Sequence, residues 1–92
     1  MTSVLPGQDL IEAGLLDLEA GRETIEALLV AIGEPRLRRL GLDLPEQLPT
    51  DPEHRLYELL ALQGSDSAHS RYNALIRKLV SFERAAECAR RS

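Results

Sequence analysis

The sequence has little material for covalent or aromatic chemistry: one cysteine, no tryptophan, one phenylalanine and two tyrosines in 92 residues. The single cysteine, Cys88, excludes an internal disulfide framework and a cysteine-rich zinc module. The longest uninterrupted apolar run, residues 27–32, is far shorter than the roughly 20 residues of a membrane-spanning helix. Residues 1–8 also lack the basic and apolar regions of a secretory leader. We therefore expect a soluble cytoplasmic protein without a membrane segment.

The residues that are abundant favour helices. Leu and Ala occur 18 and 10 times, against 4 Ile and 3 Val, and this balance is typical of α-helices rather than strands. A composition of 43% apolar and 28% charged residues is that of a folded globular chain of one domain. We predict an all-α fold, a small bundle of four or five helices with a long C-terminal helix, in a single helical domain over residues 1–92. Ten Arg against one Lys further favours a bacterial source.

Apolar spacing and helix start and stop signals divide the domain into segments. We predict a short flexible N-terminus at 1–8, an extended strap of Pro and Leu at 41–50, and helices at about 9–20, 22–33, 35–40, 51–63 and 67–90. Thr50 and Glu53 are three residues apart, which predicts a capping box at the fourth helix. Whether residues 9–33 form one helix or two stays open. Apolar heptads run in phase across Gly21, whereas Thr24 is suited to cap a new helix.

The charges are unevenly distributed along the chain. Residues 1–66 hold 13 acidic and 5 basic residues, whereas residues 67–92 hold 2 acidic and 6 basic ones. The net charge of −4 argues against a general nucleic-acid-binding protein. We expect the basic C-terminal helix to be attracted to the acidic first helices, in the same chain or in another copy.

The last predicted helix is apolar around most of its circumference. Its seam alternates steps of four and three residues: Ala68, Tyr72, Leu75, Leu79, Phe82, Ala86 and Ala89. Because four short elements would hardly cover so long an apolar helix, we expect the seam to continue into a partner. The simplest partner is a second copy related by a two-fold axis. We predict a homodimer, or a complex with another protein, through an interface formed by Tyr72, Leu75, Leu79 and Phe82.

A short cationic cluster, Arg36, Arg38 and Arg39, follows Gly33. It is compatible with a helix-turn-helix whose second helix binds DNA, although that helix would hold only about six residues. Basic residues at the end of a helix also complement the helix dipole without any ligand. The alternative function is thus a regulatory nucleic-acid-binding protein that uses this possible basic patch or the basic C-terminal helix.

Motifs for catalysis and for bound groups are weak. The segment Gly-Ser-Asp-Ser at 64–67 resembles the Gly-x-Asp-Ser motif of carrier proteins, whose serine bears phosphopantetheine. That family has further helices after the serine, and the same residues suit a helix start. Asp51, His54 and Glu58 are spaced to share one side of a helix, but one histidine is too few for a metal site. We expect no catalytic residue, no cofactor and no metal, and predict a dimerisation or protein-interaction module rather than an enzyme.

Overall fold

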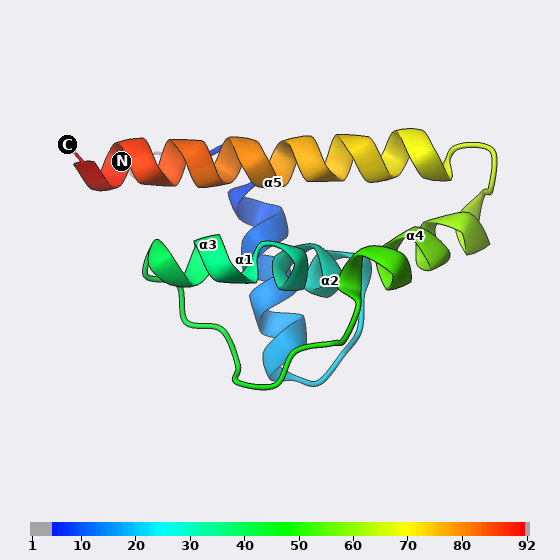
Figure 1. Ribbon diagram of the computed structural model, residues 1–92, viewed down its shortest axis with the longest axis horizontal. Helices are drawn as coiled ribbons and strands as arrows, with labels where there is room; N and C mark the ends of the chain where they lie inside the picture. Colours follow the sequence, from blue (N-terminus) through cyan, green and yellow to red (C-terminus); the bar gives the residue numbers. More distant parts are fainter. Residues whose placement is uncertain (1–4, 92) are drawn as a thin grey trace.

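The computed structural model describes residues 5–91, which form five α-helices and no strand. The helices are α1 (Gln8–Glu19), α2 (Ile25–Ile32), α3 (Glu34–Arg39), α4 (Pro52–Gln63) and α5 (Ala68–Arg91). This architecture confirms the predicted all-α bundle with a long C-terminal helix. Figure 1 shows α5 running along the long axis of the molecule, with the other helices gathered on one side of it.

α1 and α2 are separate helices, which settles the question left open for residues 9–33. Gly21 has a φ of 75°, a left-handed conformation that costs glycine little, and it lies in the turn after α1. Thr24 is the N-cap of α2, and its Oγ1 accepts a hydrogen bond from the backbone N–H of Ala27 at 3.1 Å. The same hydroxyl donates to Oδ2 of Asp17 at 2.6 Å. The start of α2 is therefore tied to the end of α1.

α1 crosses α2 at a glycine. Gly14 is buried, and a Cβ atom built on it would lie 2.4 Å from the carbonyl oxygen of Glu26 and 2.5 Å from Cγ2 of Val30. Both distances are well inside van der Waals contact, so a larger residue fits only if the two helices separate. This close approach explains why α1 contains a residue that costs about 1 kcal/mol of helix propensity.

α2 is the centre of the core. It contacts each of the other four helices. All five residues from Ala27 to Ala31 are buried, because neighbours surround the helix on every side. Large buried side chains from the other elements pack around it: Ile11, Leu37, Leu44, Leu56, Leu60, Leu79 and Phe82.

Residues 42–50 contain no helix and connect α3 to α4 on the side of the molecule away from α5 (Figure 1). Leu44 anchors this segment with a buried side chain. Arg38 donates hydrogen bonds to the carbonyl oxygens of Leu44 at 3.2 Å and Pro45 at 2.7 Å. The guanidinium thus satisfies backbone acceptors that no regular secondary structure pairs.

The predicted capping box at the start of α4 does not form. The N-cap is Asp51, with a φ of 51° and no side-chain hydrogen bond to the helix. Pro52 is the first helical residue, a position where its missing N–H and fixed φ cost nothing. This start places Thr50 one residue before the cap, so the Thr50–Glu53 spacing is out of register by one residue.

α1 begins at Gln8, directly after a turn. The backbone N–H of Leu5 donates to Oε1 of Gln8 at 2.9 Å, and Leu5 packs against the core. Gly7, with a φ of 74°, lies against the backbone of α5, since a Cβ atom on it would be 3.0 Å from the carbonyl oxygen of Lys78. Residues 1–4 of the predicted flexible N-terminus lie outside the described residues.

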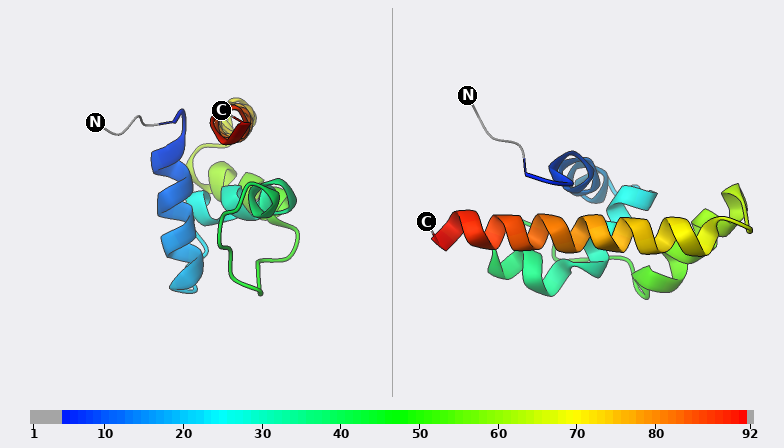
Figure 2. Two further views of the ribbon diagram at one scale, coloured as in Figure 1. Left: turned by 90° about the vertical axis from the view of Figure 1, so that its left-hand side faces the viewer. Right: turned by 90° about the horizontal axis from the view of Figure 1, so that it is seen from above.

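α5 spans 24 residues and rests on the junction of α2 and α3 as well as on α4. At the junction, a Cβ atom on Gly33 would lie 2.9 Å from Cδ1 of Leu79 and 3.1 Å from Oε2 of Glu83. Over α4, the rings of Tyr57 and Tyr72 are 5.8 Å apart between centroids. Figure 2 shows α5 from its end, with α1 running crosswise beside it and the outer side of α5 left open.

Candidate interaction surfaces

The four residues assigned to a partner interface face the interior of their own chain. Leu79 and Phe82 are 4% and 5% exposed, while Tyr72 and Leu75 are partly buried and pack against the same core. Burial raises the pKa of the Tyr72 hydroxyl above its ordinary value, and the carboxylate of Glu53 adds to this effect. The folded chain thus uses this seam as core and does not present it as a free strip.

The shorter helices cover the seam more fully than the sequence suggested. Among the residues that the structure describes, the large apolar side chains left exposed are Leu16, Tyr57 and Leu62, and none of them belongs to α5. Gly33 contributes to this cover, because a residue without a side chain lets the α2–α3 junction approach Leu79 closely. The chain itself therefore shields much of this seam, and a partner interface through it stays a prediction.

The possible basic patch is largely engaged inside the chain. Arg36 donates from Nη2 to Oε2 of Glu87 at 2.9 Å, and its Nη1 lies 4.0 Å from Oε1 of Glu83. Arg38 holds the carbonyl oxygens of the 42–50 segment, as described above. Arg39 is exposed, with its Nε 3.4 Å from a backbone carbonyl oxygen of its own helix. The three arginines therefore point to different partners and do not form one free cationic surface.

Glu83 is a buried carboxyl at the contact between α3 and α5. Its exposure is 5%, and its Oε2 lies beside the backbone of Gly33. Burial raises the pKa of the Glu83 carboxyl above its ordinary value, and the neighbouring guanidinium of Arg36 opposes this rise. A buried carboxyl that faces one cation fixes the orientation of α5 over α3.

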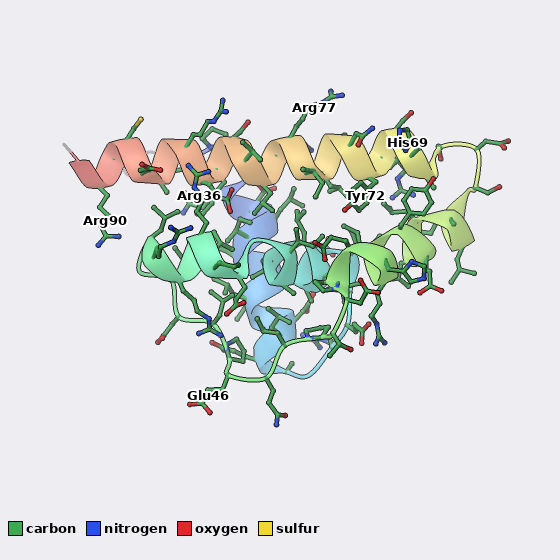
Figure 3. All side chains as sticks on the ribbon, in the orientation of Figure 1. Arg36, Glu46, His69, Tyr72, Arg77 and Arg90 are labelled. Atoms are coloured by element: carbon green, nitrogen blue, oxygen red, sulfur yellow. The ribbon has the colours of Figure 1, made fainter. Side chains whose placement is uncertain are left out.

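A surface cleft of about 580 Å³ lies between α3 and the C-terminal end of α5. Its lining consists of Arg36, Arg39, Leu40, Glu87 and Arg90. Figure 3 shows the side chains of Arg36, from α3, and Arg90, from α5, on the side of α5 that is turned toward α3. Arg90 donates a hydrogen bond to the carbonyl oxygen of Arg39. The cations of this cleft thus bind oxygens of the chain itself and connect the two helices.

The outer side of α5 is basic, and one edge of it lines a pocket of about 320 Å³ together with Gly7 and Asp9 at the start of α1. The outer basic face consists of four exposed residues, Arg77, Lys78, Ser81 and Arg84. Figure 3 shows Arg77 pointing away from the body of the molecule. The two acidic residues of α5, Glu83 and Glu87, turn toward Arg36 on α3. α5 itself therefore contributes no carboxylate to the outer basic face, although Asp9 of α1 lines the same pocket as Arg77 and Lys78.

α1 presents a face of the opposite charge. The outer acidic face consists of four exposed residues, Asp9, Glu12, Leu16 and Glu19. Steps of three and four residues place them on one side of the helix. Within the described part of the chain, the charged residues of these two faces form no ion pair with each other or with other residues. The residues of both faces are exposed, and Asp9 borders Arg77 and Lys78 at one end of them.

Among residues 5–90, no group of three or more His, Cys, Asp and Glu side chains is placed to hold a metal ion. His54 lies 3.7 Å from Glu58, but Asp51 does not complete a set of ligands with them. No helix in the described range combines the length and the apolar character needed to cross a bilayer.

The sequence indicated acidic first helices, but not that Leu16 shares the exposed side of α1 with its acidic residues. Glu12 and Glu19 flank Leu16 at helical spacing, yet Leu16 reads as one more leucine of an apolar stripe. The inward orientation of the α5 carboxylates had no sequence signal, because Arg36 and Glu87 are 51 residues apart. Only the folded chain shows which side of α5 keeps its charges.

Comparisons with protein-family models, with curated proteins and with solved structures give no match for this chain.

Proposed function

We propose that this protein is an interaction module that binds an acidic protein surface through the outer basic face of α5. One observation carries the proposal: both carboxylates of α5 turn inward to Arg36, so the exposed side of a long helix carries cations only. A helix whose inner side is fixed in a core is a rigid platform for such cations. Rigid, complementary charges steer a partner to its binding site and suppress wrong partners.

The alternative, binding to nucleic acid, would use the same face. Arg36 and Arg38 are engaged within the chain, so the cluster in α3 contributes little to it. The outer basic face has no aromatic side chain on which an unpaired base would stack. The chain as a whole is acidic, with a net charge of −4, which repels a polyanion at distances beyond the local face. A protein partner is therefore better supported than a nucleic acid.

The test compares two variants of equal net charge. Arg77→Ser with Arg84→Ser removes two cations from the outer basic face. Gln47→Glu with Thr50→Glu adds two anions at exposed positions of the 42–50 segment, on the far side of the molecule. Immobilised wild type and the control should retain the same protein from a cell extract, and the Arg77→Ser, Arg84→Ser variant should lose it. Raising the salt from about 0.05 to about 0.3 M should weaken retention, since exposed charges are screened.

Two outcomes would contradict the proposal. In the first, retention is the same for all three baits, so the outer basic face takes no part. In the second, duplex DNA or single-stranded RNA binds the wild type in a fluorescence titration and fails to bind the Arg77→Ser, Arg84→Ser variant. That result would show that the outer basic face binds nucleic acid and not an acidic protein surface.

A further inference from the structure

We infer that the acidic surface bound by the outer basic face is the outer acidic face of α1 in a second copy of this chain. The inference rests on the proposed function and identifies its partner. It assigns self-association to the outer sides of α1 and α5, not to the apolar seam of α5, which the core has taken up.

The two faces match in spacing. Glu12, Leu16 and Glu19 follow each other at steps of four and three residues in α1, and Arg77, Ser81 and Arg84 follow the same steps in α5. On each helix the outer charges are seven residues apart, or about 10.5 Å along the axis. In a parallel alignment Glu12 meets Arg77 and Glu19 meets Arg84.

The centre of this alignment is suited to close contact. Leu16 is 64% exposed and would lie opposite Ser81, a small side chain that leaves room for it. Contact with another helix would remove this apolar side chain from water. The small residue between the two arginines lets the helices approach until the flanking charges are within reach of each other.

One chain cannot align its own two faces along their length, although Asp9 at the start of α1 lines the same pocket as Arg77 and Lys78. α1 and α5 run crosswise in the folded molecule (Figure 2), whereas the matched spacing requires the two helix axes to lie side by side. The required α1 must therefore come from another copy. Because the contact joins two different surfaces, a second copy either completes a two-fold pair with both contacts formed, or continues the series as an open chain.

The association should be weak and sensitive to salt. Exposed ion pairs each contribute little, and the face holds a single large apolar side chain. We expect a dissociation constant on the order of 100 μM at low salt. Sedimentation equilibrium over protein concentrations from about 0.01 to about 1 mM covers this range.

The decisive experiment exchanges the charges. The first variant, Arg77→Glu with Arg84→Glu, makes the outer basic face acidic. The second, Glu12→Arg with Glu19→Arg, makes the outer acidic face basic. Each variant alone then opposes like charges, so its self-association should weaken at least about tenfold. An equimolar mixture restores opposite charges at both contacts, and association should return to within about threefold of the wild type.

The outcomes separate this inference from the proposed function. A wild type that stays monomeric at every concentration, or a mixture that fails to associate, overturns self-association through these faces. If the same wild type still retains another protein through Arg77 and Arg84, the proposed function stands with a different partner. Since all four substituted residues are exposed, circular dichroism and the melting temperature should match the wild type. Should a reversal variant fail to fold, Arg77→Ser with Arg84→Ser replaces it, and unchanged self-association then overturns the inference.

Discussion

The two halves of α5 are held to the rest of the molecule by different forces. The first half, from Ala68 to Phe82, is held by burial of apolar side chains against the core. The second half, beyond Phe82, is held by Arg36 with Glu83 and Glu87 and by the hydrogen bond from Arg90 to α3. Burial is non-directional and is not screened by salt, whereas ion pairs are directional and, where they are exposed, screened. The first half therefore carries stability, and the second half sets the orientation of α5 over α3.

The strongest test of this comparison removes an apolar contact from the first half. Leu79→Ala should lower the free energy of unfolding by about 3 kcal/mol, because it leaves a cavity beneath α5. Leu62→Ala is the control, since its side chain is 84% exposed and should change stability by less than about 0.5 kcal/mol. Urea denaturation measures both.

The same variant separates core from interface. If Leu79 belongs to the core, its loss of stability is the same at every protein concentration. A loss that shrinks on dilution would instead place Leu79 between two copies, because only intermolecular contacts depend on concentration. That result would restore the apolar seam as a dimer interface.

A second variant tests how closely α1 and α2 are packed against each other. Gly14→Ala should destabilise the protein by about 2 kcal/mol, although alanine favours helices, because its Cβ would collide with the backbone of Glu26. Gly21→Ala meets no atom within 4 Å but keeps a φ of 75°, so it should cost about 1 kcal/mol from backbone strain. Thermal denaturation followed by circular dichroism compares them. A neutral or stabilising Gly14→Ala would mean that α1 and α2 are not in close contact.

The smallest expected effect concerns the buried carboxyl of Glu83 beside α3, and it depends on pH. Burial raises the pKa of Glu83 in the native state, so between the ordinary and the raised pKa the native chain holds more protons than the unfolded chain. The contribution of Glu83 to stability is therefore complete at low pH and falls as the pH rises through this window. Glu83→Gln cannot ionise, so its stability relative to the wild type should increase over the same window, by less than about 1 kcal/mol.

Urea denaturation of both proteins at several pH values gives this difference. The other carboxyls are common to the two proteins and cancel in it. A difference that stays constant with pH would show that Glu83 is not desolvated. A difference that moves in the opposite direction would show that the attraction of Arg36 outweighs burial.

Local signals predicted the helices well, but not every helix start. Gly21 and Thr24 indicated the break between α1 and α2, because a left-handed glycine and a capping hydroxyl act within a few residues. The capping box at Thr50 was wrong by one residue, since Pro52 begins α4 and leaves Asp51 as the cap. Where two helix start signals are adjacent in sequence, the path of the chain before the helix decides which of them is used.

The candidate site was less predictable. The seam through Leu79 and Phe82 was predicted as a partner interface, and both side chains are buried within their own chain. Periodicity marks such a seam but does not say what buries it. Likewise, the excess of bases in residues 67–92 was visible, whereas the turn of Glu83 and Glu87 toward Arg36 was not. Both outcomes depend on contacts between segments that are far apart in sequence.

By itself, the sequence determined the all-α class, the approximate bounds of most helices, and the side of each helix that avoids water, but it left open whether residues 9–33 form one helix or two. These follow from propensity, capping and the 3.6-residue period, which act over a few residues. The tertiary structure alone decided that α5 is covered by its own chain, and that its outer side keeps cations only. Those properties arise from packing at Gly14 and Gly33 and from the pairing of Arg36, which join residues distant in the chain.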